Sequence, residues 1–466
     1  MKLLNRNRAQ AVQRDPLPLS LSTSETTFTG WGRTSPSSAT RRQATTVLDV
    51  QDVVRQAGPR GVLARGLGRS YGDAAQSGGA TVLDLSALAG VAVDGTSITA
   101  GAGASLDGVL RSIVPLGVFV PVTPGTRMVT VGGAIAADIH GKNHHGAGSF
   151  GNHVQRLTLV DGQGQARTLQ PGDATASEFW ATVGGMGLTG VITEATFNGI
   201  AITSSRMLVD TERANDLEDV MARMLARDHE YRYSVAWIDS VSASGRGVIT
   251  RGDHAPVDAL PIDQRGKALE YGPRPIATAP PFIPSGVLNR LSARAFNEAW
   301  FRRHPKHRAG ELQPIAGFFH PLDGVLEWNR IYGPGGFLQY QFVVPDEAGE
   351  IVGLALRRLR EIGAPSFLTV LKRFGPANPA PLSFPQPGWT LAADVPARLP
   401  GLGAVLDELD EAVAASGGRL YLAKDSRMSP TMFQRTYPRL AEWRTARQQL
   451  DPQGVFVSDL SRRLEL

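Results

Sequence analysis

The amino-acid sequence predicts an α+β protein with two domains. Its 466 residues are too many for one hydrophobic core, because single cores stop growing at about 250–300 residues. From about Thr45 to Asn198, short apolar segments alternate with glycine-rich turns. Beyond residue 200 the apolar segments become longer and a proline-rich stretch interrupts them. These three observations place a domain boundary near residue 200.

The first domain is predicted from short strands and one clear helix. Apolar runs bounded by glycine predict strands at Val82–Leu85, Val91–Val93 and Ser97–Ala100. Ser105 has the side chain of a helix cap, and apolar residues follow at helical spacing over Leu106–Ile113. Pro115 and Gly117 end this helix, and Val118 begins another short strand.

The second domain is predicted from longer elements. Apolar or alternating runs predict strands at Tyr231–Ser240, Phe337–Val344, Ser366–Phe374 and Arg419–Ala423. Helical spacing predicts helices at Glu347–Ile362 and Leu402–Ser416. The stretch Arg251–Ser285 is rich in proline and irregular, and a loop of this length is either disordered or a functional lid. Residues 1–25 are expected to form a disordered leader.

Composition excludes several classes of protein. The chain has no cysteine, which excludes disulfides, a thiolate nucleophile, Cys-based zinc sites and a cysteinyl bond to a cofactor. No apolar run approaches the ~20 residues that cross a bilayer. The N-terminus lacks the apolar segment of a secretion signal. We therefore expect neither a signal peptide nor a transmembrane segment.

A formal net charge of +5 is compatible with three kinds of binding partner: nucleic acid, an anionic membrane surface or a phosphorylated substrate. Lysine and arginine are spread along the chain, and the densest group is F-R-R-H-P-K-H-R at 301–308, with Arg302, Arg303, Lys306 and Arg308. No aromatic platform is interleaved with it, so a solvated basic loop is favoured over a nucleic-acid patch. We expect no nucleic-acid partner.

Two glycine-rich segments carry the strongest functional signal. They are A-R-G-L-G-R-S-Y-G-D at 64–73 and P-G-T-R-M-V-T-V-G-G-A-I-A-A-D-I-H-G-K-N-H-H at 124–145. Glycine reaches positive φ easily and leaves backbone N–H groups unobstructed, so such loops can wrap a pyrophosphate. Together they indicate a dinucleotide held outside a Rossmann unit. Ordinary tight turns are the alternative, because isolated glycine motifs have little specificity.

Longer strings around these loops resemble one known family, the FAD-dependent oxidases of the vanillyl-alcohol-oxidase type. The similar strings are G-R-S-Y-G-D (68–73), the whole of 124–145, A-G-S-F-G-N-H-V (147–154), F-W-A-T-V-G-G-M-G-L-T-G (179–190), G-P-G-G-F-L-Q-Y-Q-F (333–342) and G-G-R-L-Y-L-A-K-D-S-R (417–427). The resemblance runs from Gly30 to the end of the chain. It is to the branch of the family that acts on polyprenyl-phosphoryl ribose.

The resemblance implies a two-domain α+β fold of the vanillyl-alcohol-oxidase type. The FAD-binding domain would cover residues 26–198. A substrate-binding domain with an antiparallel sheet would cover 199–415, with mobile loops near 251–285 and 321–336. Residues 416–466 would then return to the FAD-binding domain.

The resemblance also implies which residues contact FAD. They are Ala64, Arg65, Gly66, Leu67, Gly68, Arg69, Ser70, Tyr71, Gly72, Asp73, Ala74, Gly125, Thr130, Val131, Gly132, Gly133, Ala137, Asp138, Ile139, His140, Ile192 and Tyr421. Many relatives attach FAD through the histidine of a G-x-G-H-S loop. Arg69 stands at that position here, and cysteine is absent, so the sequence predicts non-covalent FAD.

Four histidines gather between residues 140 and 153, namely His140, His144, His145 and His153. A zinc site is the obvious alternative for such a cluster. No carboxylate follows Asp138 until Asp161, so we expect no metal and assign His140 to the flavin side.

By resemblance, Lys424, His140 and Gln341 are the catalytic candidates, and Lys424 would help to remove the hydroxyl proton. Desolvation near the flavin would lower its pKa and suit it to that role. The strand sequence independently places Gln339 and Gln341 on one side, where two amides can orient sugar hydroxyls. An exposed polar edge is the alternative for the glutamines. A surface ion pair is the alternative for Lys372 and Lys424. Tyr421 and Lys424 have opposite parity, so both face the flavin only if the strand ends or bulges between them.

The substrate side would be formed by Lys142, Gln339, Lys372, Trp237, Phe319, Thr390 and Ala392. Lys142 is expected to contact a phosphate or a hydroxyl. Core packing is the alternative for Trp237 and Phe319. In mycobacterial relatives a cysteine that anchors covalent nitro-aromatic inhibitors occupies the position of Ala392, and asparagine occupies that of Thr390. The resemblance therefore implies that such inhibitors lose their covalent mode here and that Thr390 changes a polar contact.

The resemblance therefore implies FAD-dependent oxidation of the 2′-hydroxyl of a polyprenyl-phosphoryl-β-D-ribose to the 2′-keto sugar. This is the first half of an epimerisation that yields the arabinose donor for cell-wall arabinan, and a partner keto-sugar reductase would complete it. Peripheral association with the inner membrane face is expected, from the cytoplasm or the periplasm. The enzyme alternative is a related sugar-alcohol or aldonolactone oxidase. The non-enzyme alternative, a basic nucleic-acid-binding protein, does not account for the glycine loops.

Overall fold

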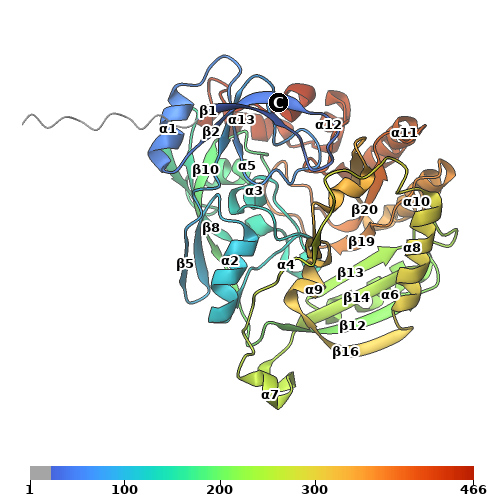
Figure 1. The fold of residues 1–466 in the computed structure, drawn as a ribbon. Helices are drawn as coiled ribbons and strands as arrows, with labels where there is room; N and C mark the ends of the chain where they lie inside the picture. Colours follow the sequence, from blue (N-terminus) through green and yellow to red (C-terminus); the bar gives the residue numbers. More distant parts are fainter. Residues whose placement is uncertain (1–22) are drawn as a thin grey trace, which may run out of the picture.

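The computed structural model describes residues 23–466, which form three main β-sheets with helices packed around them (Figure 1). Strands from the first two hundred residues build two smaller sheets. Strands from the remainder build one large antiparallel sheet.

The four-stranded sheet has the order β1-β2-β4-β3. Its strands are β1 (Thr23–Phe28), β2 (Ser37–Gln43), β4 (Thr81–Asp84) and β3 (Val62–Arg65). β2, β4 and β3 run parallel, and α1 (Val47–Arg55) connects β2 to β3. Thr46 caps α1 in a reciprocal capping box with Asp49. Val50, Val53 and Val54 bury the apolar side of α1 against this sheet.

The five-stranded sheet is antiparallel, with the order β5-β6-β10-β8-β9. Its strands are β5 (Val91–Asp94), β6 (Ser97–Gly101), β10 (Val191–Asn198), β8 (Val154–Val160) and β9 (Ala166–Leu169). Residues of α2 (Leu106–Ile113), α3 (Val131–Ala136) and α5 (Ala176–Thr182) share its hydrophobic core. A small pair, β7 (Val118–Phe119) and β11 (Ile200–Ala201), lies where the chain leaves this part.

The eight-stranded sheet has the order β16-β12-β14-β13-β19-β20-β18-β21, and every pairing is antiparallel. Its strands are β16 (His307–Pro314), β12 (Arg206–Ala214), β14 (Gly247–His254), β13 (Tyr233–Ile238), β19 (Thr369–Phe374), β20 (Gly388–Pro396), β18 (Phe337–Val344) and β21 (Arg419–Leu420). The predicted antiparallel sheet is therefore present.

The two faces of this sheet have different environments. Ala236, Ile249 and Leu391 point to one face and share a hydrophobic core with α6 (Leu217–Arg227), α10 (Glu350–Glu361) and α11 (Leu402–Ala415). Side chains alternate along a strand, so their immediate neighbours point to the other face. That second face is turned toward the two smaller sheets (Figure 1).

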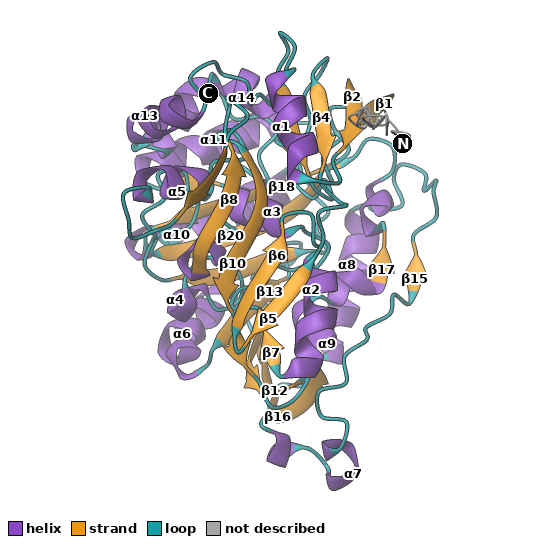
Figure 2. Ribbon diagram, turned by 90° about the vertical axis from the view of Figure 1, so that its left-hand side faces the viewer, coloured by secondary structure: helices purple, strands orange, loops and turns teal. Residues whose placement is uncertain are grey.

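The remaining elements are short or lie at the edges. α8 (Arg290–Arg303) is anchored by Asn297, whose amide donates to Asp239 and to the carbonyl of Ser366. The others are α4 (His144–Ala147), α7 (Ile262–Arg265), α9 (Ile315–Phe319), β15 (Ala277–Thr278) and β17 (Val325–Leu326). α7 projects from the body of the molecule (Figure 2).

The C-terminal helices are α12 (Pro430–Thr436), α13 (Leu440–Leu450) and α14 (Asp459–Leu464) (Figure 1). α13 packs against α5 of the N-terminal part, and α12 packs against α11 and α14. The indole N–H of Trp443 donates to the carbonyl of Ala181 at 3.0 Å. Arg463 forms a bidentate pair with Asp73, with both N–O distances 2.8 Å. These contacts join the last and first parts of the chain.

The structure corrects two predictions about secondary structure and adds strands that were not predicted. Residues 23–25, assigned to the leader, belong to β1, and the rest of that prediction lies outside the described residues. Arg251 does not begin an irregular loop, because it lies in β14, where it forms ion pairs with Glu212 and Asp228. β20 was not predicted. By contrast, α2 and β18 have the predicted bounds.

Trp443 offers a test of how strongly the C-terminal helices stabilise the fold. Its side chain is 0% exposed, so Trp443→Ala should lower the free energy of unfolding by about 3–5 kcal/mol. Chemical denaturation followed by far-UV circular dichroism measures this loss. Leu48→Ala, at a side chain that is 69% exposed, should change it by less than about 0.5 kcal/mol. Equal effects of the two substitutions would contradict the packing described.

Candidate functional site

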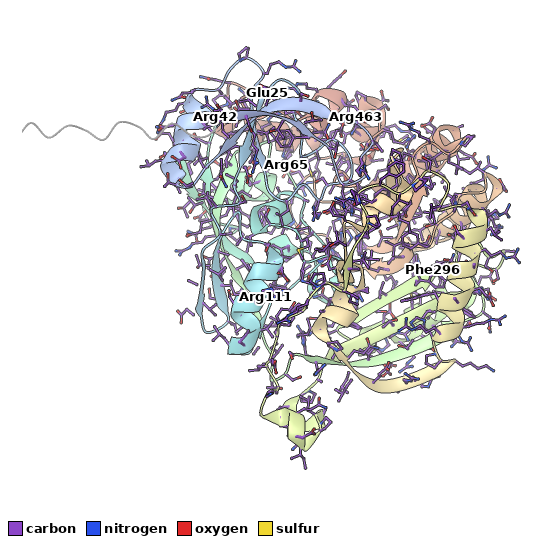
Figure 3. All side chains as sticks on the ribbon, in the orientation of Figure 1. Glu25, Arg42, Arg65, Arg111, Phe296 and Arg463 are labelled. Carbon is purple, nitrogen blue, oxygen red and sulfur yellow. The ribbon has the colours of Figure 1, made fainter. Side chains whose placement is uncertain are left out.

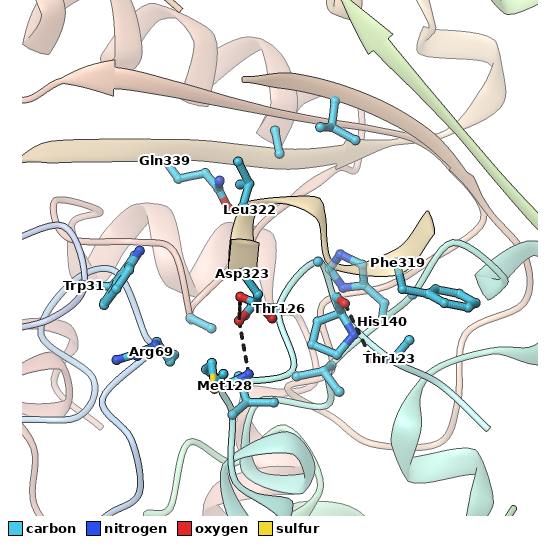
Figure 4. A pocket seen from close by; sticks show the side chains of 18 of the residues that line it. Trp31, Arg69, Thr123, Thr126, Met128, His140, Phe319, Leu322, Asp323 and Gln339 are labelled. Atoms are coloured by element: carbon cyan, nitrogen blue, oxygen red, sulfur yellow. Dashed lines mark hydrogen bonds between the residues drawn. The ribbon is translucent and has the colours of Figure 1, made fainter. Parts of the chain in front are cut away.

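A cavity of about 850 Å³ lies between the open face of the eight-stranded sheet and the two smaller sheets. Both glycine-rich segments reach it. In Figure 4, Trp31 and Arg69 lie on one side, His140 and Phe319 on the other, and Asp323 between them. The cavity therefore brings together residues from distant parts of the sequence.

The first glycine segment follows β3 and lines the cavity from Ala64 to Tyr71. Within residues 23–466, the backbone N–H groups from Gly66 to Ser70 donate no hydrogen bond to another backbone group. A Cβ on Gly66 would lie 2.2 Å from Oγ1 of Thr130, so only glycine allows the two loops to approach so closely. The guanidinium of Arg69 stacks 4.0 Å from the ring centroid of Trp31.

The second glycine segment enters α3. The hydroxyl of Thr130 caps this helix by accepting the N–H of Gly133 at 3.2 Å. Thr130, Gly132 and Gly133 line the cavity, as does Gly125. A Cβ on Gly132 would lie 2.9 Å from the Cβ of Ala102. Both glycine segments therefore present backbone rather than side chains to the same space.

His140 and Gln341 meet at the centre of the cavity wall. The amide of Gln341 donates to Nε2 of His140 at 3.0 Å, an arrangement that leaves the ring proton on Nδ1. Within the described residues Nδ1 has no hydrogen-bond partner. Burial, together with the charge of Lys372, holds the pKa of His140 well below its usual range. His140 is therefore a neutral imidazole.

Lys424 and Tyr421 both face the cavity because β21 ends at Leu420 and a turn follows. This resolves their opposite parity. The ammonium of Lys424 lies 3.6 Å from the ring centroid of Tyr71. Burial lowers the pKa of Lys424, while the carboxylate of Asp394 acts in the opposite direction.

Asp394 was not identified from the sequence. It is 0% exposed and accepts a hydrogen bond from Gln339 at 2.5 Å. Burial raises its pKa, and the charge of Lys424 opposes that rise. Gln339 also donates to the hydroxyl of Tyr71 at 3.3 Å. Asp394, Gln339, Tyr71 and Lys424 thus form one polar cluster at the cavity wall.

Two more lysines, Lys142 and Lys372, line the cavity. Lys142 donates to the carbonyl of Phe318, and its ammonium lies 4.2 Å from the ring centroid of that residue. Burial lowers the pKa of Lys142 to about 7, with a further contribution from the charge of Lys372. Burial also lowers the pKa of Lys372 to about 8. A surface ion pair is thus the wrong interpretation of Lys372 and Lys424.

Asp323 is a second acidic residue that sequence reasoning missed. It lies in the segment 321–336, and its carboxylate accepts from the hydroxyl of Thr126 at 2.6 Å and the backbone N–H of Arg127 at 2.8 Å. Arg127 also pairs with Asp107 at 2.5 Å. These bonds hold the segment against the second glycine loop at the cavity edge.

Most of the predicted site residues line this cavity, including all three catalytic candidates. The predicted site residues outside the cavity lining are Gly72, Asp73, Val131, Asp138 and Thr390.

Three of these five residues have side chains that bond to other parts of the protein. Asp138 was expected near the flavin ring, but its buried carboxylate accepts from Ser149 and the N–H of Gly151. Asp73 pairs with Arg463. Thr390 lies behind Gln341, which donates to its hydroxyl at 3.3 Å.

The other three histidines of the cluster have separate partners. Nδ1 of His144 accepts the N–H of Gly375, and the rings of His145 and His153 bond the carbonyls of Tyr231 and Ala147. Among residues 23–466, no group of three or more His, Asp or Glu side chains could hold a metal ion.

Comparisons with known proteins agree on the class of cofactor. Residues 40–170 match the family model of the FAD binding domain, and residues 400–464 match that of D-arabinono-1,4-lactone oxidase. The chain is 44% identical over 450 residues to decaprenylphosphoryl-beta-D-ribose oxidase from Mycolicibacterium smegmatis, covering 94% of this chain and 97% of that protein. An uncharacterized protein from Streptomyces coelicolor is 41% identical over 367 residues, covering 76% and 98% respectively.

FAD is therefore the cofactor, as predicted. The cavity fits such a ligand, because its volume falls within the ~300–1,000 Å³ typical of ligand sites and the N–H groups from Gly66 to Ser70 are free for phosphate oxygens. The two glycine segments would hold the dinucleotide. Tyr421, Ile139 and His140 would lie along its ring.

The absence of side chains at Gly66 gives a test of this cofactor site. Gly66→Ala should weaken FAD binding by about tenfold or more, because its Cβ would push the first loop away from Thr130. Flavin fluorescence titration of apoprotein measures the affinity. Gly58→Ala, where a Cβ would meet nothing within 4 Å, should bind FAD like the parent. Denaturation should also release all flavin, and a flavin that stays on the denatured polypeptide would contradict non-covalent binding.

Proposed function

This chain belongs to the family of decaprenylphosphoryl-β-D-ribose oxidases, and we propose that it oxidises the 2′-hydroxyl of a polyprenyl-phosphoryl-β-D-ribose to the 2′-keto sugar. One observation carries the proposal: identity of 44% to a named oxidase extends over 94% of the chain. The polar cluster around Lys424 supplies the groups that such a reaction needs.

The proposal includes the two-domain layout of the vanillyl-alcohol-oxidase type. Residues 26–198 and 416–466 would hold FAD, because they contain both glycine segments and the C-terminal helices packed on them. Residues 199–415 would hold the sugar and its lipid, because they supply nearly all of the eight-stranded sheet.

Different residues of the site would bind different parts of the substrate. Gln339 and Gln341 would orient the ribose hydroxyls, since both amides come from the same face of β18. Lys142 and Lys372 would bind the phosphate, whose negative charge would raise their lowered pKa values again. Trp237, Phe319 and Ala392 would shape the apolar part of the pocket.

Lys424 would act as the general base. Its lowered pKa makes the neutral amine available, and Nζ would accept the proton of the 2′-hydroxyl. Asp394 would then stabilise the resulting ammonium from its position beside Gln339. FAD, when bound, supplies the acceptor for the hydride that leaves C2′, the carbon that carries this hydroxyl. His140, which stays neutral, would fix the amide of Gln341 through their hydrogen bond.

The keto sugar would be the substrate of a separate reductase, whose product would serve as an arabinose donor for cell-wall arabinan. A lipid-linked substrate favours peripheral association with a membrane, from the cytoplasm or the periplasm. Among the described residues, none of the helices is both long and apolar enough to cross a bilayer.

One observation favours a second candidate, because residues 400–464 match the model of D-arabinono-1,4-lactone oxidase. This candidate would oxidise a free sugar lactone or sugar alcohol with O₂. It leaves the two phosphate-binding lysines without a partner.

Anaerobic mixing with polyprenyl-phosphoryl ribose tests the proposed reaction. The flavin absorbance of the oxidised enzyme should bleach within one turnover, and mass spectrometry should find a product two hydrogens lighter. Free ribose and aldonolactones should leave the absorbance unchanged. Bleaching by a lactone but not by the lipid-linked sugar would instead support the second candidate.

The pH profile tests the roles of Lys424 and Asp394. Because the base works as the neutral amine, kcat/KM should rise with pH through the pKa of Lys424. Lys424→Met should lower kcat by about 10²–10⁴-fold and remove this limb. Asp394→Asn removes a negative charge that favours the ammonium, so the limb should shift to lower pH. A limb that stays in place in both variants would contradict these assignments.

A further inference from the structure

The cavity extends well beyond the residues that the proposed reaction uses. From the cluster of Gln341 and Lys424 it continues along the open face of the eight-stranded sheet to the far edge strand, β16. This sheet-face trough is lined by Val370, Trp237, Val235, Val248, Thr250 and Thr211.

The register of the sheet makes the trough continuous. Gln341 pairs with Ala392, Ala392 with Val370, Val370 with Trp237, and Trp237 with Val248. All five side chains line the cavity. They form one row across five strands, about 19 Å long at ~4.8 Å per strand. Beyond Gln341 the row contains no charged residue.

A second row continues to the edge of the sheet. Val235 pairs with Thr250, Thr250 with Thr211, and Thr211 with Arg308 on β16, and all four line the cavity. The basic run found in the sequence therefore lies at the end of the trough, where Arg303 and His304 also line the cavity.

The far end of the trough opens beside exposed aromatic residues. Trp300 of α8 lines the cavity, and Phe296 stacks on it at 6.0 Å with an interplanar angle of 13°. Phe296 is 46% exposed and is labelled beside α8 in Figure 3. An apolar surface thus leads from the cavity to the outside of the molecule.

The basic residues at the far end of the trough lie too far from Gln341 to bind the phosphate of the substrate. β16 lies six strands from β18, about 29 Å from Gln341. The phosphate of a ribosyl phosphate lies a few bonds from the sugar, so Arg303 and Arg308 cannot reach it while the ribose contacts Gln341. Lys142 and Lys372, at the start of the trough, remain as its partners.

We propose that the sheet-face trough binds the isoprenoid tail of the substrate, which leaves the molecule at the edge formed by β16 and the end of α8. This inference rests on the proposed function and adds the path of the lipid. The occupant is a long hydrocarbon chain linked to a phosphate. The first row is apolar beyond Gln341 and begins at the reaction end, and the second row continues it to the edge of the sheet.

Two substitutions would obstruct the trough far from the reacting groups. Val235→Trp fills it, and Thr250→Glu places a charge where the hydrocarbon would lie. Thr168→Glu is the matched control, since Thr168 is exposed on β9 of another sheet. The substrates are decaprenylphosphoryl ribose and its two-isoprene analogue, geranylphosphoryl ribose. Retained flavin and an unchanged melting temperature establish that each variant is folded.

We expect the ratio of kcat/KM for the long over the short substrate to fall about tenfold or more in Val235→Trp and Thr250→Glu. In Thr168→Glu the ratio should stay that of the parent. An equal loss for both tail lengths, or no loss for either, would overturn the assignment of the trough.

Binding of decaprenyl phosphate, which has no sugar to oxidise, separates this inference from the proposed reaction. Tryptophan quenching should show tighter binding of decaprenyl phosphate than of geranyl phosphate, and the two trough substitutions should remove the difference. If the two lipid phosphates show this difference in binding while no lipid-linked ribose is oxidised, the proposed function is wrong but the assignment of the trough to the isoprenoid tail is supported. If both lipids bind equally to the parent protein, the trough assignment fails whatever the activity.

Discussion

The register of the eight-stranded sheet determines which side chains meet in the cavity. Gln341, Ala392, Val370 and Trp237 come from four strands, and only one pairing of those strands places them in a row. A slip by one residue would turn the row into the core beneath α10 and α11 and bring core residues into the cavity. The buried face fixes that register, since its apolar side chains have no other place to pack. Packing on one face therefore maintains the site on the other.

Desolvation then gives the site its chemical character. Three lysines line the cavity, and the buried Asp394 acts on Lys424 from its position beside Gln339. The same burial that lowers the pKa values of the lysines raises that of Asp394. The low dielectric makes a neutral amine available close to physiological pH, and in the proposed function it makes the substrate phosphate the counter-ion for the other two lysines. Binding and proton transfer thus depend on one environment.

The sequence predicted helices and strands better than it predicted which distant residues lie in contact. The apolar spacing of Leu106–Ile113 and its serine cap indicated a helix with the observed bounds. β20 was missed because W-T-L-A-A-D-V-P is buried on both faces and shows little alternation. Asp394 was missed with it, since its role depends on pairing opposite Gln339. The motif gave the position of Asp138 but not the direction of its side chain, which lies outside the cavity lining and accepts hydrogen bonds from Ser149 and Gly151.

The junction of the chain's two ends has a consequence for synthesis. The N–H of Tyr71, in the first glycine segment, donates to the carbonyl of Ala423, and Asp73 is held by Arg463 of α14. Arg463 is 390 residues later in the sequence than Asp73, so during translation it leaves the ribosome long after the first glycine segment. A nascent chain that has not yet reached α14 therefore holds the first glycine segment without this support.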